Sequence, residues 1–258
     1  MHERLSFYIH RTSPLHQANP LTKLVFVLSV ILISYLSPWY WTAVALIGLD
    51  ILLSFAGNIQ REYLSVVRRL VLPVVGFLFV MQSLFLPEGE TIIFSFWFID
   101  LSLENVQTAF LNASRIFVMV SSFILLILTT HPSELMSDLT RRGLPGQLAY
   151  VVVSTLQILP QMQVKAATII DAQRSRGLDT EGGFRKRVGS LLPLVGPLVF
   201  GSLVEVEERA IAIEARAFTS RIPKTSLREI PDTQFDKGLR WLLVFFTVLV
   251  ILLRIWLS

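Results

Sequence analysis

The sequence predicts an all-α membrane protein with about five transmembrane helices and a cytoplasmic domain of two long helices and a short one. Three observations support this fold class. Of the 258 residues, 53% are hydrophobic and only 16% are charged. The hydrophobic residues gather in long blocks, as membrane-spanning helices require. The polar segments between the blocks alternate between basic and acidic, which is typical of loops on opposite sides of a membrane.

The predicted spans follow the hydrophobic blocks from the amino terminus onward. They cover residues 24–36, 41–56, 70–86, 106–129 and 239–257. Pro38 ends the first block, because proline lacks the N–H that a helix interior needs. The aromatic residues 39–41 beside it suit a membrane–water interface. Residues 91–99 alternate loosely and are aromatic, so they predict either a short hairpin or a segment that lies on the bilayer.

Loop charges predict the orientation of the spans. Segments 1–23 and 57–69 are basic, whereas segment 87–105 holds four acidic residues and no Lys or Arg. Because basic residues gather in cytoplasmic loops, we expect the amino terminus inside and, after five spans, the carboxyl terminus outside. The same rule explains the net charge of +4 better than nucleic-acid binding does, so nucleic acid is not an expected partner.

The region 130–237 contains two uncharged runs, at residues 146–164 and 188–204, that are each long enough to span a membrane. If both crossed it, the basic segment 165–187 would lie outside, against the charge rule. We therefore predict three domains. They are an N-terminal membrane domain over residues 1–129 with four spans, a cytoplasmic domain over 130–237 and a last transmembrane helix over 238–258.

The cytoplasmic domain is expected to contain a short helix over residues 133–142 and long helices over 145–176 and 186–219. Prolines and glycines within the long helices suit kinked helices that pack on protein better than straight spans. Ser133 is expected to cap the short helix, since its hydroxyl can accept a hydrogen bond from a first-turn N–H. Gly143 is expected to end that helix.

One short pattern occurs twice, each time at the end of a long predicted helix. In each copy an arginine stands between two small residues, and the copies are Arg174-Ser175-Arg176-Gly177 and Ala215-Arg216-Ala217. A cation in the last turn of a helix interacts favourably with the helix dipole, by about 0.3–1 kcal/mol. An arginine flanked by small residues also presents an unobstructed five-donor fork that suits docking into a partner's groove. The recurrence at a second helix end favours docking.

Two charged residues, Asp50 and Arg115, lie inside predicted spans. A charge at a helix centre costs about 2.5–3.5 kcal/mol to insert, so both side chains should face protein or each other. Counted from the outer ends of their spans at about 1.5 Å per residue, they lie at depths of roughly 18 and 15 Å. A structural ion pair is one interpretation, and a proton-coupling site of a secondary transporter is the other.

The sequence shows none of the common catalytic or cofactor-binding patterns. It has no glycine-rich phosphate loop, no nucleophile elbow and no paired catalytic carboxylates. It contains no cysteine, and its four histidines have no metal-ligand partner three or four residues away. We therefore expect a protein without enzymatic activity, cofactor or metal.

Four motifs give the sequence a resemblance to a known family. They are Ser13-Pro14-Leu15-His16 with Asn19-Pro20-Leu21-Thr22-Lys23-Leu24, Thr129 to Leu135, Ala172 to Gly177, and Glu208 to Phe218. Over nearly the whole chain, the sequence resembles the transmembrane T component of energy-coupling factor transporters, which are ABC-class importers of vitamins and metal ions. The resemblance implies a multi-pass protein of the prokaryotic cytoplasmic membrane.

In that family, two cytoplasmic coupling helices dock into grooves on two ATPase subunits, and a separate S-type membrane subunit captures the vitamin or ion. The resemblance therefore implies that residues 130–237 form a coupling domain and that Arg176 and Arg216 make the docking contacts. The two helix ends would be shaped by Arg174, Ser175, Gly177, Ala215 and Ala217. The alternative is an ion-coupled secondary transporter that uses Asp50 and Arg115, although no inverted repeat supports it.

The second motif departs from the family pattern at Ala217, where glycine is usual. Glycine adopts a left-handed conformation without steric cost, whereas alanine does so less easily. We therefore expect the second long helix to continue past Ala217 towards Pro223 before it ends.

Overall fold

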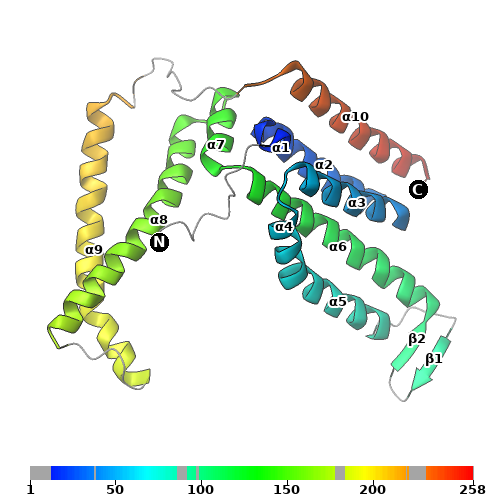
Figure 1. Ribbon diagram of the computed structural model, residues 1–258, viewed down its shortest axis with the longest axis horizontal. Helices are drawn as coiled ribbons and strands as arrows, with labels where there is room; N and C mark the ends of the chain where they lie inside the picture. The colour runs from blue at the N-terminus through cyan, green and yellow to red at the C-terminus, as the bar shows by residue number, and fades with distance from the viewer. Residues whose placement is uncertain are drawn as a thin grey trace. The chain divides into compact units, whose positions relative to one another are not determined.

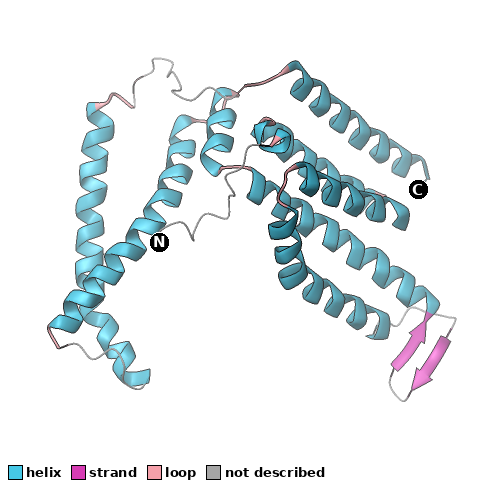
Figure 2. Ribbon diagram, in the orientation of Figure 1, coloured by secondary structure: helices cyan, strands magenta, loops and turns pink. Residues whose placement is uncertain are grey.

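The computed structural model describes residues 13–37, 39–85, 92–96, 99–177, 184–218, 220 and 231–257. Within these residues the regular elements are helices and one two-stranded hairpin (Figure 2), so the predicted all-α class is confirmed. The chain forms two compact units, residues 1–143 with 230–258 and residues 144–229. The predicted cytoplasmic domain over residues 130–237 stays a prediction.

The first unit carries most of the helices (Figure 1). Its described helices are α1 (Pro14–Gln17), α2 (Pro20–Leu36), α3 (Tyr40–Ala56), α4 (Gln60–Val66), the π-helical segment η1 (Val67–Val71), α5 (Leu72–Phe85), α6 (Leu103–Thr129), α7 (Pro132–Arg141) and α10 (Gln234–Leu257). Since α4, η1 and α5 follow one another without a break, they form one continuous helix, Gln60–Phe85.

Three helices of the described chain are long and apolar enough to cross a membrane: Gln60–Phe85, Leu103–Thr129 and Gln234–Trp256. The apolar helices α2 and α3 are shorter, with 17 residues each. At a rise of about 1.5 Å per residue they are roughly 26 Å long, close to the ~30 Å hydrocarbon core of a bilayer. Each of these five helices covers nearly all of one predicted span. The third begins at Gln60, ten residues before the span predicted at residues 70–86, because the charged segment before that span is also helical. The number of spans and their orientation stay predictions.

The π-helical segment η1 precedes a proline inside the continuous helix. Pro73 has no N–H to donate, and its ring would clash with the carbonyl group four residues earlier in a regular α-helix. In η1 the hydrogen-bond ladder widens, and the Leu72 N–H donates to the Val67 carbonyl five residues before it. We interpret this π turn as the local adjustment that lets the helix continue through Pro73.

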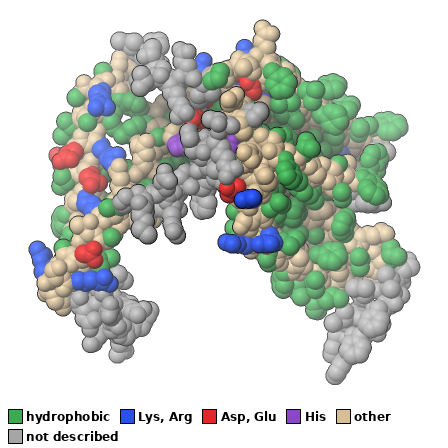
Figure 3. Space-filling model, viewed as in Figure 1, with side chains coloured by type: hydrophobic (Ala, Val, Ile, Leu, Met, Phe, Trp, Pro, Cys, Tyr) green, Lys and Arg blue, Asp and Glu red, His purple; other side chains and the backbone are tan. Residues whose placement is uncertain are grey.

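The core of the first unit lies around α6, since α2, α3, α4 and α5 all pack against it. Its buried face includes the small residues Ala109, Ala113, Ser121 and Ser122, which let neighbouring helices approach closely. Larger core side chains, such as Tyr63, Val67 and Val71, come from the helix Gln60–Phe85. Hydrophobic side chains also cover much of the outer surface of this unit (Figure 3), as expected for helices that face lipid.

For residues 91–99 the sequence allowed either a short hairpin or a segment that lies on the bilayer, and the structure has a hairpin here. Strand β1 (Ile92–Phe96) pairs antiparallel with β2 (Ile99–Ser102), with an irregularity between Ile92 and Phe94. Ser102 at the end of β2 then caps α6, because its hydroxyl accepts a hydrogen bond from the Asn105 N–H at 3.2 Å. The hairpin therefore leads directly into the central helix.

The two charges inside the spans do not pair with each other, so the expected Asp50–Arg115 ion pair is wrong. Asp50 is fully buried, and its Oδ2 accepts hydrogen bonds from the hydroxyls of Ser121 at 2.8 Å and Ser122 at 2.7 Å. Arg115 instead donates to backbone carbonyls at the end of α2. Depth along a helix did not predict this outcome, because partners also depend on how each helix is rotated about its axis.

The second unit contains α8 (Gly146–Ser175) and α9 (Phe184–Ala215), close to the two long helices that the sequence predicts. The short helix α7, in the first unit, begins one residue earlier than expected. It starts at Pro132, and the His131 ring accepts a hydrogen bond from the Ser133 N–H at 3.2 Å. The cap predicted at Ser133 is therefore wrong, because proline takes the first helical position, which it favours. Gly143 follows this helix with a positive φ of 113°, as predicted.

The hydrogen bonds of Asp50 predict which pairs of substitutions are energetically coupled. The changes in the free energy of unfolding for Asp50→Ala and Ser122→Ala should not add, because each removes the same hydrogen bond. Those for Asp50→Ala and Arg115→Ala should add to within about 0.5 kcal/mol, because these residues share no partner. The measurement is reversible unfolding of the purified protein in detergent. A coupling energy above about 0.5 kcal/mol between Asp50→Ala and Arg115→Ala would instead indicate that the two side chains form an ion pair.

Candidate functional site

The candidate site consists of the C-terminal ends of α8 and α9. The two helices run antiparallel and cross (Figure 1), as their contacts show. Near the crossing, Lys165 Nζ lies 2.7 Å from Glu205 Oε1. Towards the other end of the pair, the rings of Tyr150 and Phe218 lie 5.3 Å apart. The end of α9 therefore lies beside the beginning of α8.

Polar contacts fix the two helices against each other. Besides the ion pair of Lys165 with Glu205, the Arg209 guanidinium donates to Gln161 Oε1 at 2.9 Å. Lys165 reaches Glu205 across Gly201, where an added Cβ would lie 2.8 Å from Nζ. The hydrogen bond from Lys165 lowers the pKa of Glu205 below its ordinary value, so the Glu205 carboxylate stays ionised at neutral pH. Charged side chains gather along this unit (Figure 3).

The end of α8 has the geometry that the first arginine motif predicts. Arg176 is the C-cap residue, and Gly177 follows with φ 91°. Glycine adopts this left-handed conformation without steric cost, and the Gly177 N–H donates to the Arg174 carbonyl at 2.9 Å. The Nη1 atom of Arg174 lies 3.9 Å from Oδ1 of Asp171. The Arg176 side chain is exposed and makes no hydrogen bond or ion pair with the described residues.

The end of α9 overturns one expectation. The helix ends at Ala215 and does not continue towards Pro223, because Ala217 adopts the left-handed conformation with φ 54°. The Phe218 N–H donates to the Ile213 carbonyl at 3.1 Å, and the Ala217 N–H to the Glu214 carbonyl at 2.9 Å. This is a complete Schellman motif. Its bonds and the contact of Phe218 with Tyr150 offset the ~1–2 kcal/mol that a left-handed alanine costs.

The two arginines thus lie at opposite ends of the second unit. Arg216 follows the end of α9, which the contact of Phe218 with Tyr150 places beside the first turns of α8. Arg176 follows the end of α8, roughly 25 residues further along that helix. At about 1.5 Å per residue the separation is ~38 Å. Arg216 is also exposed and makes no side-chain bond to the described residues, so both guanidinium groups are available to a partner.

A cluster of charges in the first unit joins the two points where the chain leaves and re-enters that unit. Asp232 accepts from Arg142 at 3.0 Å and from Arg240 at 2.7 Å, and we call these three residues the junction cluster. Arg142 also bonds to Asp138 at 3.2 Å. The cluster connects α7, which precedes the second unit in the chain, to α10, which follows it. Sequence analysis missed it, because Arg142 lies 90 residues before Asp232 and the three residues form no local pattern.

The amino-terminal motif supports the same region of the first unit. Lys23 donates to the carbonyl oxygen of Thr129 at 2.9 Å, and the Asn19 N–H donates to Asp236 Oδ1 at 3.3 Å. These bonds tie the beginning of α2 to the end of α6 and the first turn of α10. The motifs at residues 13–24 and 129–135 therefore meet in space, where their role is structural.

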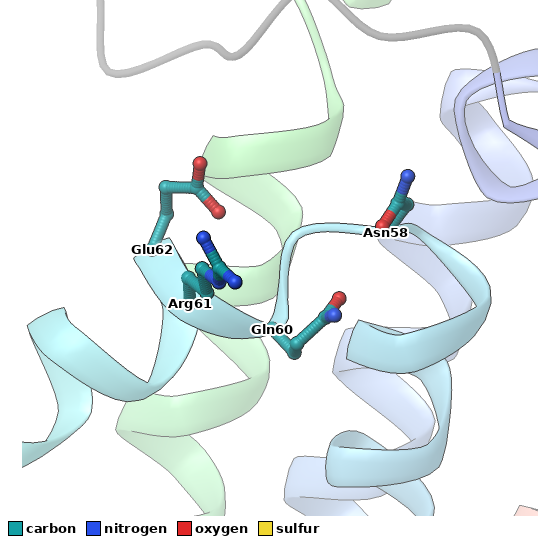
Figure 4. A pocket seen from close by; sticks show the side chains of 4 residues that line it. All are labelled: Asn58, Gln60, Arg61 and Glu62. Carbon is teal, nitrogen blue, oxygen red and sulfur yellow. The ribbon is translucent and has the colours of Figure 1, made fainter.

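A small hollow lies at the turn between α3 and α4 (Figure 4). It measures about 250 Å³ and is lined by Asn58, Gln60, Arg61 and Glu62. It includes none of the predicted site residues. Within the described part of the chain, no three His, Asp or Glu side chains lie together in a way that could hold a metal ion.

Known proteins resemble this chain over most of its length. The family described as cobalt transport protein, CbiQ, matches residues 11–227. The chain is 28% identical to the energy-coupling factor transporter transmembrane protein EcfT of Exiguobacterium sibiricum, over 96% of this chain and 97% of the relative. It is 32% identical to the protein of that name from Thermanaerovibrio acidaminovorans, over 88% and 87%. For the one from Bacillus subtilis the identity is 28%, over 96% of both chains.

The junction cluster predicts a dependence of stability on pH. Burial raises the pKa of Asp232, but the hydrogen bonds from Arg240 and Arg142 outweigh it, so the pKa lies below its ordinary value. The stabilisation is therefore complete above the unfolded pKa of about 3.9 and is lost as pH falls through the lower folded pKa. Asp232→Asn should lower the free energy of unfolding at pH 7 by about 1–2 kcal/mol.

The measurement is unfolding of wild type and variant in detergent between pH 7 and pH 3. The difference in the free energy of unfolding between wild type and variant should stay constant down to about pH 4. It should shrink below that pH, as Asp232 becomes protonated. Glu207→Gln, at an exposed position, is the matched control and should leave stability unchanged at every pH. A difference for Asp232→Asn that did not depend on pH would contradict the ionic role of this carboxylate.

The left-handed Ala217 predicts a sharp dependence on the side chain at that position. Ala217→Val should open the end of α9, because a β-branched residue is a severe outlier at positive φ, while Ala217→Gly should tighten it slightly. Hydrogen exchange at the amides of Ala217 and Phe218 measures both effects. Ala212→Val is the control, since it makes the same change inside the helix. Equal effects of the two valine substitutions would show that the left-handed conformation is not required.

Proposed function

The chain belongs to the CbiQ family of cobalt transport proteins and is a transmembrane component of an energy-coupling factor transporter in the prokaryotic cell membrane, and on this premise we propose that the ends of α8 and α9 dock onto two ATPase subunits. The observation that supports this most is the pair of exposed guanidinium groups of Arg176 and Arg216. Each follows a capped helix end, and neither is bonded to the described residues.

The distance between the two arginines suits two separate attachments. A separation of ~38 Å along α8 is too large for one small groove, so each arginine engages a subunit of its own. Lys165, Glu205, Arg209 and Gln161 fix the helices against each other between these ends. A movement of either ATPase subunit is therefore transmitted to the other end of the pair. Arg174, Ser175, Gly177 and Ala215 hold the docking ends in shape.

A second surface of α8 and α9 suits a membrane protein partner. Large hydrophobic side chains on both helices are exposed, including Leu159, Phe200, Leu203, Val206 and Ile211 at 55–71%. Exposed apolar surface of this extent marks an interaction site in a folded protein. We assign it to the substrate-capturing S-type subunit, whose movement releases substrate inside.

This chain is then a subunit without enzymatic activity of its own, because its partners hydrolyse the ATP. The name of the matching family indicates a metal ion as one class of substrate, and the resemblance to vitamin importers indicates the other. The choice between them belongs to the capture subunit. The family assignment favours this function over an ion-coupled secondary transporter, and the hydroxyl partners of Asp50 support a structural role for that carboxylate.

Replacement of the two arginines tests the docking role. Arg176→Ala and Arg216→Ala should each weaken binding of the ATPase subunits about thirtyfold, since a desolvated arginine at an interface centre often contributes 2 kcal/mol or more. The double variant should lose far more, because it removes both attachments and their avidity. Lysine should rescue poorly, since it lacks the planar fork. The measurements are pull-down of the ATPase subunits and coupled ATP hydrolysis in vesicles.

Arg209→Ala is the matched control, because Arg209 lies on α9 and its guanidinium is bonded to Gln161. Binding of the ATPase subunits by this variant should change much less than by Arg216→Ala. A double variant of Arg176 and Arg216 that reached normal abundance in the membrane and bound both ATPase subunits as wild type does would remove the docking role from both motifs.

A further inference from the structure

The first unit contains a pocket that the docking function does not use. It lies among α2, α5 and α6 and has a volume of about 420 Å³. Its walls are mostly apolar, with Ile31 and Leu32 from α2 and Ile116 and Met119 from α6. One cation, Arg115, lies among them. A pocket with apolar walls and a single charge suits an amphiphile with a charge of opposite sign.

The positive charge of Arg115 is not neutralised by any described residue. Its Nε donates to the Ser34 carbonyl at 3.1 Å and its Nη2 to the Ser37 carbonyl at 2.8 Å. These carbonyls belong to the last turn of α2, where helix carbonyls lack intrahelical partners. A guanidinium has five N–H donors, so donors remain for a ligand. Arg254 of α10 lies near enough to repel Arg115 electrostatically, which makes a bound anion more favourable still.

The pocket opens at the level of a membrane interface. The exposed aromatic side chains Tyr35, Trp39 and Trp41, at 73%, 65% and 68%, surround the end of α2 and the beginning of α3. Rings of this kind mark the headgroup region of a bilayer. The Tyr35 ring itself lies 5.7 Å from the Arg115 guanidinium. We therefore place Arg115 at the level of the lipid phosphate groups, because its partners are the carbonyls at the end of α2. This is nearer the interface than the depth of ~15 Å counted along its own span.

We propose that this pocket binds one anionic phospholipid, whose phosphate group contacts Arg115 and whose acyl chain lies along Ile31, Leu32, Ile116 and Met119. A phosphate matches the fork of an arginine, which binds it with two parallel hydrogen bonds. Gln82 and Asn112, bonded to each other at 3.3 Å, also line the pocket and offer polar contacts to the headgroup. The bound lipid supplies a counter-charge that no described residue supplies to Arg115.

Native mass spectrometry of the full chain tests the proposal. The protein is released from micelles that contain equal amounts of phosphatidylglycerol and phosphatidylcholine. Wild type should retain one phosphatidylglycerol molecule, and Arg115→Ala should weaken this binding at least tenfold. Arg115→Lys should fall between them, because it keeps the charge and loses the fork. Arg68→Ala, at an exposed cation outside the pocket, is the matched control and should keep the lipid.

Met119→Trp tests the contribution of the pocket independently of the charge of Arg115. It fills the space for the acyl chain, leaves the bonds of Arg115 to α2 intact and should also abolish retention, so the test stands if Arg115→Ala fails to fold. Added inorganic phosphate should not displace the lipid, which distinguishes a lipid site from a site for a free anion. Equal retention of both lipids, displacement by phosphate, or unchanged retention in Met119→Trp would each overturn the proposal.

Discussion

The double ion pair of Asp232 with Arg142 and Arg240 is the interaction that holds together the two places where the chain leaves and re-enters the first unit. The second unit, residues 144–229, is one long excursion from the first. Asp232 joins α7, which precedes it, to α10, which follows it. In the docking role proposed above, force on the second unit would enter the first through these two chain connections.

The second unit presents an exposed arginine at each of two distant helix ends. Each of its long helices ends in a left-handed residue that stops the helix and exposes an arginine beside it. Gly177 does this without strain, whereas Ala217 is held by the Schellman bonds to Ile213 and Glu214. The ion pair between Lys165 and Glu205 fixes the helices near their crossing. Caps define the positions of the arginines, and packing between the helices defines the distance between them.

Charges inside the first unit follow a different rule. A bilayer core offers no water, so each polar group must be satisfied by protein or by a ligand. Asp50 accepts from the hydroxyls of Ser121 and Ser122. Lys23 donates to the Thr129 carbonyl at a helix end, and Arg115 does the same with α2 while keeping an uncompensated charge. The uncompensated charge of Arg115 is the basis of the lipid site proposed above.

The sequence by itself determined the positions of the apolar helices, the two long helices of the second unit and the arginines at their ends. These features depend on local properties, namely hydrophobic blocks, prolines and glycines at helix ends. Only the tertiary structure decided which groups satisfy Asp50 and Arg115, because depth along a helix leaves its rotation undetermined. It also decided where α9 ends, since the ring of Tyr150 on another helix supports Phe218 beside the left-handed Ala217. The junction cluster formed in the same way, because only folding brings Arg142 and Asp232 together.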